Sequence, residues 1–205
     1  MNIEVKNSKK LVDYVESMKI LEQRVIDVHA GKRNELLWIM EHNPVYTAGT
    51  SSSMKDILDK NIKIIKTNRG GKITYHGPGQ KVVYFVLNLN EREKNIKKLV
   101  NKVENCIIEI LKEYKIQSYA DRKNIGIWVG KEKNSKKIAA IGIKVKRWIA
   151  YHGFSINISN DLTKYNYIMP CGLESNKITS LKEVGTSNLK NIDNIIAQKF
   201  LDIFL

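Results

Sequence analysis

The sequence has few cysteines and no long apolar run, and these two absences exclude several classes of protein. Its two cysteines, Cys106 and Cys171, lie far apart with no second cysteine near either, so no thiolate metal site is expected. No stretch approaches the ~20 apolar residues that span a bilayer, and Met1–Lys10 holds no apolar signal-peptide core. We therefore expect a reduced, cytoplasmic protein.

The sequence also lacks the composition shifts that would divide it into parts, because it has no linker, internal repeat or low-complexity tract. A length of 205 residues fits one domain, and a hydrophobic content of 42% is enough for a core without disulfide bonds. Helix-like and strand-like apolar spacings both occur along the chain. We predict a single domain over residues 1–205 of the α/β (α+β) class, with a mostly antiparallel or mixed sheet flanked by helices.

Acidic residues are scarce relative to basic ones, and the formal net charge is +14. Such a charge is compatible with a nucleic acid, an anionic membrane or an acidic protein as partner. It is equally compatible with a general lysine bias on solvated faces. Lysine is spread along the whole chain, without a dense basic block or interleaved aromatics, and this weakens the nucleic-acid interpretation. An acidic protein partner remains open.

Apolar residues at the three- and four-residue spacing of a helix mark three segments. The first stripe runs from Leu11 to Val28, in a helix expected to begin near Ser8 and to end at Gly31. The remaining predicted elements are helices near residues 96–111 and 189–203, strands at Leu36–Met40, Ile62–Thr67, Val82–Leu89, Ile125–Val129, Lys137–Val145 and Ile149–Ile158, and a shaped loop at Glu41–Gly49.

Residues 69–80 (RGGKITYHGPGQ) hold four of the twelve glycines and one of the three prolines, between two strand-like runs. A turn needs one or two glycines, so four of them around Arg69 and His76 favour a binding loop. Glycine lets the backbone approach a ligand closely and turn its N–H groups toward a carbonyl or phosphate oxygen. The alternative is a glycine-rich turn that only changes the chain direction.

Cys171 is the cysteine whose neighbours expose it. It lies in Met169–Gly172 (MPCG), where a proline and a glycine predict a tight turn outside any helix or strand. Most cysteines are buried structural residues, and Cys106, beside the apolar stripe of the second helix, is expected to be one of them. Cys171 is the candidate for chemistry.

Lys137 is the second candidate, because of its place on a predicted strand. Alternation puts it on the apolar face with Ala139, Ile141 and Ile143, whereas Lys136 belongs to the wet face. An inward lysine at the entry of a strand either extends its ammonium group back to water, which is the commoner case, or has a function.

Five segments together resemble the lipoyl(octanoyl) transferases, also called lipoate–protein ligase B. They follow that family's order along the chain, and five linked motifs are far more specific than one glycine pattern. One position departs from the family: Phe85 follows a tyrosine where the family often has proline. Because Phe85 lies in a predicted strand, this departure puts little of the resemblance in doubt. The segments are Glu41–Gly49 (EHNPVYTAG), Arg69–Gln80 (RGGKITYHGPGQ), Lys137–Gly142 (KIAAIG), His152–Asn157 (HGFSIN) and Pro170–Leu181 (PCGLESNKITSL).

The resemblance implies the fold shared by biotin and lipoate ligases, and transfer of an octanoyl group through a thioester on Cys171. It implies Lys137 as the partner of Cys171, and His76 and His152 as residues that shape the acyl pocket. The implied substrate-contacting residues are Arg69, Gly70, Gly71, Lys72, Ile73, Thr74, Tyr75, His76, Ala140, Ile141, Gly142, Gly153, Phe154 and Ser155.

The same resemblance implies the partners. The octanoyl donor would be acyl carrier protein, and the acceptors would be lipoyl domains of 2-oxo acid dehydrogenases and the glycine cleavage H protein. No nucleic acid, membrane, ATP, other cofactor or metal is implied, because a thioester donor is already activated. Backbone amides near Gly71, Gly77 or Gly172 could hold the tetrahedral oxyanion, and the sequence does not choose among them.

Three other functions deserve comparison with this one. An ATP-dependent lipoate or biotin ligase of the same fold needs no nucleophilic cysteine, so the Pro170–Gly172 turn argues against it. A basic nucleic-acid-binding domain would explain the charge but not the cysteine turn. A catalytically silent acyl-binding homologue would lack Cys171 or Lys137, and both are present.

Overall fold

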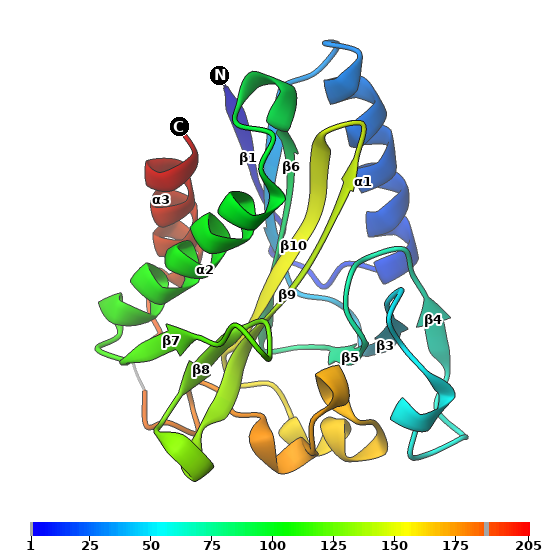
Figure 1. Cartoon of the computed structure of the whole chain (residues 1–205), viewed down its shortest axis with the longest axis vertical. Helices are drawn as coiled ribbons and strands as arrows, with labels where there is room; N and C mark the ends of the chain where they lie inside the picture. The colour runs from blue at the N-terminus through cyan, green and yellow to red at the C-terminus, as the bar shows by residue number, and fades with distance from the viewer. Residues whose placement is uncertain (1, 187–188) are drawn as a thin grey trace.

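The computed structural model describes residues 2–186 and 189–205, which form a sheet with helices on both faces (Figure 1). Helix α1 (Tyr14–His29) covers one face of the larger sheet. Helices α2 (Ile96–Glu113) and α3 (Ile192–Phe204) pack against each other over the opposite face. This single-domain α+β architecture with a mixed sheet confirms the predicted fold class.

The larger sheet has seven strands among the described residues, in the order β1-β2-β6-β10-β9-β8-β7. The β1–β2 pair is parallel and the other neighbouring pairs are antiparallel. Strands β6 and β10 form its centre, where every residue of β10 is buried. In sheet order the bounds are β1 Ile3–Asn7, β2 Glu35–Met40, β6 Gln80–Asn88, β10 Ile149–Asn157, β9 Lys136–Lys146, β8 Ile127–Val129 and β7 Ser118–Ala120.

A second, three-stranded sheet consists of β3 (Val45–Ala48), β4 (Ile64–Lys66) and β5 (Ile73–His76), in the order β4-β3-β5. The sequence-based prediction was wrong for two of these strands, because β3 lies in the expected loop 41–49 and β5 in the expected loop 69–80. Both are only four residues long, and each is stabilised by pairing with the other. Local glycine and proline signals mark the ends of such strands but do not reveal a distant partner.

Helix α1 begins later than predicted. Its N-cap is Asp13 rather than a residue near Ser8, and the Asp13 carboxylate accepts a hydrogen bond from a backbone amide of the first turn at 3.0 Å. The backbone of residues 8–12 instead forms hydrogen bonds with the end of β2 and the residue after it. Leu11 therefore lies outside the helix and is 44% exposed; Val15 lies inside it and is 45% exposed, although both belonged to the predicted apolar stripe.

The alternation of β6 gives the large sheet two separate cores. One set of its side chains points toward α2 and α3, namely Val83, Phe85 and Leu87. The residues that alternate with them point toward α1, namely Val82, Tyr84 and Val86. The Phe85 ring packs with its centroid 5.7 Å from that of Phe200 in α3. Each such large apolar side chain contributes roughly 1.5–3 kcal/mol when fully buried. No helix among the described residues is both long enough and apolar enough to cross a bilayer.

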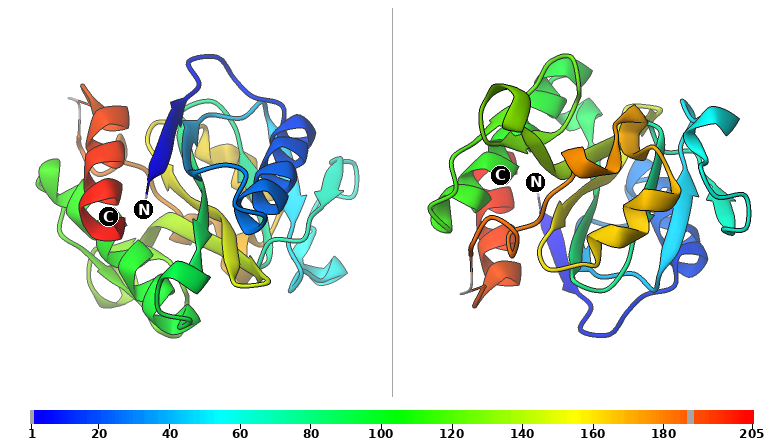
Figure 2. Two further views of the ribbon diagram at one scale, coloured as in Figure 1. Left: turned by 90° about the horizontal axis from the view of Figure 1, so that it is seen from above. Right: turned by 90° about the horizontal axis from the view of Figure 1, so that it is seen from below.

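Between β10 and α3 the chain crosses one end of the molecule in short 3-10 turns, yellow to orange in Figure 2. These turns pack against β5 and β9. The middle turn is Pro170–Gly172, which carries Cys171. The backbone amide of Thr179 also donates a hydrogen bond to the carbonyl of Lys137 at 3.0 Å. The segment with the cysteine is thereby fixed beside the first residues of β9.

Gly142 of β9 and Gly153 of β10 lie opposite each other in the centre of the large sheet. A Cβ atom on Gly153 would overlap the carbonyl oxygen of Val83 in β6. A Cβ atom on Gly142 would lie 3.1 Å from the carbonyl oxygen of Gly70. The two glycines therefore allow close strand pairing and let the segment after Arg69 lie directly on the sheet.

We predict that Gly153→Ala lowers the free energy of unfolding by about 3 kcal/mol, because β6 and β10 must separate to accept the methyl group. Gly31→Ala is the control. Gly31 ends α1 with φ +69° and would have no atom within 4 Å of a Cβ, so this change adds only backbone strain of about 1 kcal/mol. Urea unfolding of both variants measures the difference. Equal losses would contradict the steric explanation.

Candidate active site

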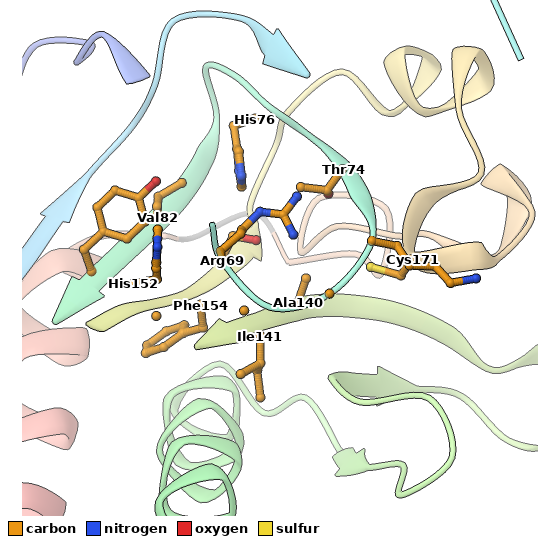
Figure 3. A pocket seen from close by; sticks show the side chains of 15 residues that line it. Arg69, Thr74, His76, Val82, Ala140, Ile141, His152, Phe154 and Cys171 are labelled. Atoms are coloured by element: carbon orange, nitrogen blue, oxygen red, sulfur yellow. The ribbon is translucent and has the colours of Figure 1, made fainter. Parts of the chain in front are cut away.

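A pocket with a cavity volume of about 50 Å³ lies between the segment 69–76, strands β9 and β10, and the turn that carries Cys171 (Figure 3). Cys171 lies on one side of it and His152 on the other, with Arg69 between them. The walls combine apolar side chains and glycine backbone with a few polar groups. The lining residues are Arg69, Gly71, Lys72, Thr74, His76, Val82, Tyr84, Ala140, Ile141, Gly142, His152, Gly153, Phe154, Ser155 and Cys171.

Cys171 adopts a left-handed backbone conformation, with φ 56° and ψ 20°. This conformation is uncommon for a residue other than glycine. The turn around it is closed by hydrogen bonds from the Gly172 amide to Met169 at 2.9 Å and from the Leu173 amide to Pro170 at 3.0 Å. The thiol is half-buried and lines the pocket.

Cys106 has the opposite environment. It is fully buried in α2, as predicted, and this burial raises the pKa of its thiol to about 12. A thiol of that kind stays protonated and inert near neutral pH. Of the two cysteines, only Cys171 reaches a pocket.

Lys137 is buried, with 4% of its surface exposed, whereas Lys136 is exposed. Its Nζ lies 5.8 Å from the centre of the Trp128 ring, and among the described residues no carboxylate forms an ion pair with it. A Cβ atom on Gly126 would overlap the Lys137 side chain, so that glycine makes the space for it. Lys137 and Cys171 line one small hollow, which adjoins the larger pocket through Ala140 and other shared residues.

The reason for the position of Lys137 differs from the prediction. A register shift in the β8–β9 pairing leaves Ile138 between two paired residues, because Trp128 pairs with Lys137 and Ile127 with Ala139. Ile138 and Ala139 both enter the core under α2. The expected face shared by Lys137 and Ile141 is therefore wrong. Lys137 instead lines its hollow together with Ala140.

Arg69 places a fixed positive charge inside the pocket. Its guanidinium donates hydrogen bonds to the carbonyl and hydroxyl oxygens of Thr47 at 2.8 and 2.9 Å, and to the Gly70 carbonyl at 3.0 Å. Burial lowers the pKa of Arg69, and the neighbouring Tyr14 and Cys171 oppose that effect. An arginine remains protonated even so. Its ligands are neutral, so the positive charge is not cancelled locally.

His76 is held in one tautomer by Gln80. The Gln80 amide nitrogen donates to the oxygens of Asn157 and Tyr165, both at 2.9 Å, so its Oε1 must accept from His76 Nδ1 at 2.6 Å. Burial lowers the pKa of His76 to about 3, with further lowering by His42 and Arg69. His76 is therefore neutral at physiological pH, with its proton on Nδ1.

His152 is also neutral. Its Nε2–H donates a hydrogen bond to Asn68 Oδ1 at 2.7 Å, and its buried Nδ1 has no hydrogen-bond partner. Burial lowers the pKa of His152 to about 3, and Arg69 and Lys144 add to the effect. No hydrogen bond joins His76 or His152 to Cys171 within residues 2–186 and 189–205. The structure thus places both histidines along the pocket rather than beside the thiol.

Sequence reasoning missed three further residues. Val82 and Tyr84 line the pocket, and alternation on the predicted strand after Gln80 could have indicated them. His42 lies in the segment Glu41–Gly49 that resembles the family, but it was not among the predicted site residues. Its Nδ1 donates to the Val12 carbonyl at 2.8 Å and its Nε2 accepts from the Tyr84 hydroxyl at 2.9 Å. Burial lowers the pKa of His42 as well, so the Tyr84 hydroxyl on the pocket wall has an uncharged partner behind it.

Most of the predicted substrate-contacting residues lie at the pocket, and three do not: Gly70, Ile73 and Tyr75. Ile73 and Tyr75 alternate with Thr74 and His76 on β5, so they face a separate apolar cluster under the 3-10 turns. The roles of the pocket residues stay predictions. No three histidine, cysteine, aspartate or glutamate side chains in the described part of the chain gather closely enough to bind a metal ion.

We predict that stability falls as pH falls from about 6.5 toward 3. His76 and His152 have pKa values of about 3 in the folded chain against an ordinary 6.5, so the unfolded state binds their protons first. The stabilisation is complete above pH 6.5, and about 2 kcal/mol per histidine is lost by about pH 5. Urea unfolding at several pH values measures this loss.

The double variant His76→Gln/His152→Gln tests the assignment. Its absolute stability differs from that of the wild type, so the comparison concerns the change in unfolding free energy between about pH 8 and pH 5. That change should shrink by about 4 kcal/mol if both histidines carry it. An unaltered pH dependence would show that other groups are responsible.

Residues 13–201 match the model of the family described as "Lipoyl protein ligase A/B catalytic domain". An octanoyltransferase of Ehrlichia chaffeensis is 42% identical over 205 residues, with 98% of this chain and 96% of that protein covered. An octanoyltransferase of Anaplasma phagocytophilum is 42% identical over 207 residues, with both chains covered completely.

Solved structures show the same fold at low sequence identity. A putative lipoate protein ligase from T. acidophilum with bound lipoic acid has a TM-score of 0.78 and 14% identity, covering 99% of this chain and 86% of that one. A lipoate-protein ligase A bound with ATP has a TM-score of 0.73 and 13% identity, covering 98% of this chain and 85% of that one. These likenesses concern the fold alone.

Proposed function

The chain belongs to the lipoyl protein ligase A/B catalytic domain family, and from this premise we propose how its pocket carries out acyl transfer. Its relatives at 42% identity over nearly the full length are octanoyltransferases. The chain is accordingly an octanoyltransferase acting in lipoylation. The donor, the covalent intermediate, the acceptor and the residue roles given below are our proposal.

The donor is octanoyl-acyl carrier protein, and Cys171 is the nucleophile. In the first step the Cys171 thiolate attacks the thioester carbonyl, a new carbon–sulfur bond forms, and the bond to the carrier thiol breaks. That thiol leaves as a thiolate and takes up a proton. Exchange of one thioester for another is nearly balanced in energy, so the octanoyl group stays reactive on the enzyme.

The acceptor is a lysine of a lipoyl domain, as in the 2-oxo acid dehydrogenases and the glycine cleavage H protein. In the second step its neutral amine attacks the Cys171 thioester. A carbon–nitrogen bond forms, the bond to Cys171 breaks, and the amine loses a proton. Lys137 takes part in this proton transfer, since it lines the same small hollow as the thiol. ATP has no role because the donor is already a thioester.

The single observation that carries the proposal is the setting of Cys171. It is the cysteine that lines a pocket, in a strained turn, with cationic side chains on several sides. Lys72 Nζ lies over the turn, 2.5 Å from where a Cβ of Gly172 would stand, and Asp56 pairs with it at 3.9 Å. Positive charge around a thiol favours the thiolate, which is the reactive form.

The rest of the pocket suits an apolar chain. Val82, Ile141 and Phe154 contribute apolar walls, and Gly142 and Gly153 contribute flat backbone. An octanoyl group bound at Cys171 extends along these walls toward His152. The neutral state of the histidines matters here, because a charged imidazolium would oppose the burial of an apolar chain.

We predict that Cys171 forms an octanoyl thioester when the protein is mixed with octanoyl-acyl carrier protein without ATP. Cys171→Ala should abolish the adduct, because no other thiol reaches the pocket. Cys106→Ala should leave it unchanged, since Cys106 is buried in α2 with a pKa of about 12. Mass spectrometry of the intact protein, with hydroxylamine to cleave the thioester, reports the adduct and its site. A wild-type rate of adduct formation in Cys171→Ala would refute the assignment.

Lys137 and Cys171 should act as one functional unit. Lys137→Ala should slow the acylation of Cys171 by roughly 10²–10⁴-fold, the range of general acid–base groups, because the hollow then lacks its ammonium group. Lys136→Ala is the matched control, one residue away and exposed, and should change the rate by less than about twofold. Iodoacetamide alkylation of Cys171 against pH gives an independent readout. If both variants shift that profile equally, Lys137 has no special role.

A further inference from the structure

His152 lies at the end of the pocket opposite Cys171 (Figure 3). Its side chain is almost completely buried, with 1% of the residue exposed. The ring is held between aromatic neighbours, with its centroid 4.8 Å from that of Tyr151 and 6.2 Å from that of Tyr84. Anything that extends along the pocket from Cys171 meets this ring.

Behind His152 lies Asn68, which accepts the hydrogen bond from His152 Nε2 at 2.7 Å. Asn68 is itself held from outside, because its side-chain amide donates to Glu22 Oε1 of α1 at 2.9 Å. Asn68 faces a different hollow, between α1 and the β9–β10 hairpin, whose floor includes Val25 and Tyr151. One hydrogen-bonded pair therefore separates the inner pocket from this outer hollow.

The backbone conformation of His152 favours the His152–Asn68 hydrogen bond. His152 holds φ 66°, a left-handed conformation in the middle of a buried strand, and this turns its ring away from the regular alternation of β10. The ring is neutral and its Nε2 proton is directed to Asn68, as shown above. A neutral ring presents a surface that an apolar chain can touch, and its hydrogen bond resists displacement.

We propose that His152 and Asn68 form the end wall of the acyl pocket and set the longest acyl chain that the enzyme accepts. This inference rests on the proposed function, in which the acyl group extends from Cys171. Each methylene that fits inside the pocket strengthens binding by about fourfold through burial. A methylene beyond the wall must push the His152 ring aside, break its hydrogen bond to Asn68 and leave both polar groups without a partner.

Removal of the wall should join the two hollows. His152→Gly removes the ring, and glycine adopts the left-handed conformation freely. Asn68→Ala keeps the ring but removes its hydrogen-bond acceptor, so the ring can swing toward the outer hollow. Lys146→Ala is the matched control, because Lys146 lines the outer hollow without belonging to the wall.

The test uses acyl thioesters of a small thiol, N-acetylcysteamine, with saturated chains of about six to fourteen carbons. The rate of adduct formation on Cys171 is followed by mass spectrometry. We expect the wild-type rate to rise with each methylene to an optimum near octanoyl and then to fall by about tenfold or more. His152→Gly should move the optimum by about two to four carbons toward longer chains, with about fourfold gained per added methylene. Asn68→Ala should shift it in the same direction by less, and Lys146→Ala should leave it in place.

A second measurement separates this proposal from the covalent mechanism. Calorimetric binding of the free fatty acids, octanoate to tetradecanoate, requires no reaction at Cys171. One outcome is that no adduct forms in any protein but that His152→Gly binds the longer acids better than the wild type does. That result would support the end wall and refute the covalent intermediate. If His152→Gly is unfolded by circular dichroism, Asn68→Ala decides. The proposal is wrong if the wild type and the folded wall variants prefer the same acyl chain length in both measurements.

Discussion

The site depends on how closely the backbone after Arg69 approaches the large sheet. A Cβ atom on Gly70 would lie 2.9 Å from the Ile143 carbonyl, and one on Gly142 would lie 3.1 Å from the Gly70 carbonyl. From the other side, a Cβ on Gly49 would lie 2.8 Å from the Arg69 guanidinium. Side chains at these positions would lift the segment off the sheet. Glycine is what lets Arg69 enter the pocket while its neighbours close over it.

This close approach determines the electrostatics. Arg69 is buried among neutral oxygen atoms and Lys137 beside an aromatic ring, so among the described residues neither cation pairs with a carboxylate. Lys72, over the Cys171 turn, does pair with the buried Asp56 at 3.9 Å. Further cations would be costly there, which is why burial and Arg69 together hold the pKa values of His76 and His152 at about 3. The pocket thus combines positive charge at the end with the thiol and uncharged rings at the other. That polarity matches a thioester whose head reacts and whose tail is inert.

The sequence predicted the elements whose signals are local and long. The stripe of α2 and the apolar runs of β6 and β10 are of this kind, and all three elements form where they were predicted. Strands β3 and β5 escaped prediction because four residues carry little periodicity, and their mutual pairing depends on distant contacts. The start of α1 was placed too early because apolar spacing does not distinguish a helix from residues 8–12, which run beside the end of β2.

The candidate site shows the same division. Cys171 and Lys137 were indicated by their neighbours in sequence and by the family resemblance. The burial of Lys137 was also foreseen, but its direction was not, because a register shift at Ile138 leaves no mark in the alternation of the segment. His42 was missed for a related reason. Its partners, Val12 and Tyr84, are remote in sequence, and only the folded chain brings them together.

The fold does not by itself decide how an acyl group is activated, since a lipoate-protein ligase A bound with ATP shares it at a TM-score of 0.73. In the proposed function, that difference lies in the one turn that carries Cys171. Cys171 holds φ 56° and the following Gly172 holds φ 77°, so the chain is left-handed at two successive positions. Stability alone would favour glycine or asparagine at the first of them, because other side chains strain that conformation. The proposed nucleophilic role accounts for a cysteine placed there against the backbone's preference, with its thiol lining the pocket, whereas packing does not.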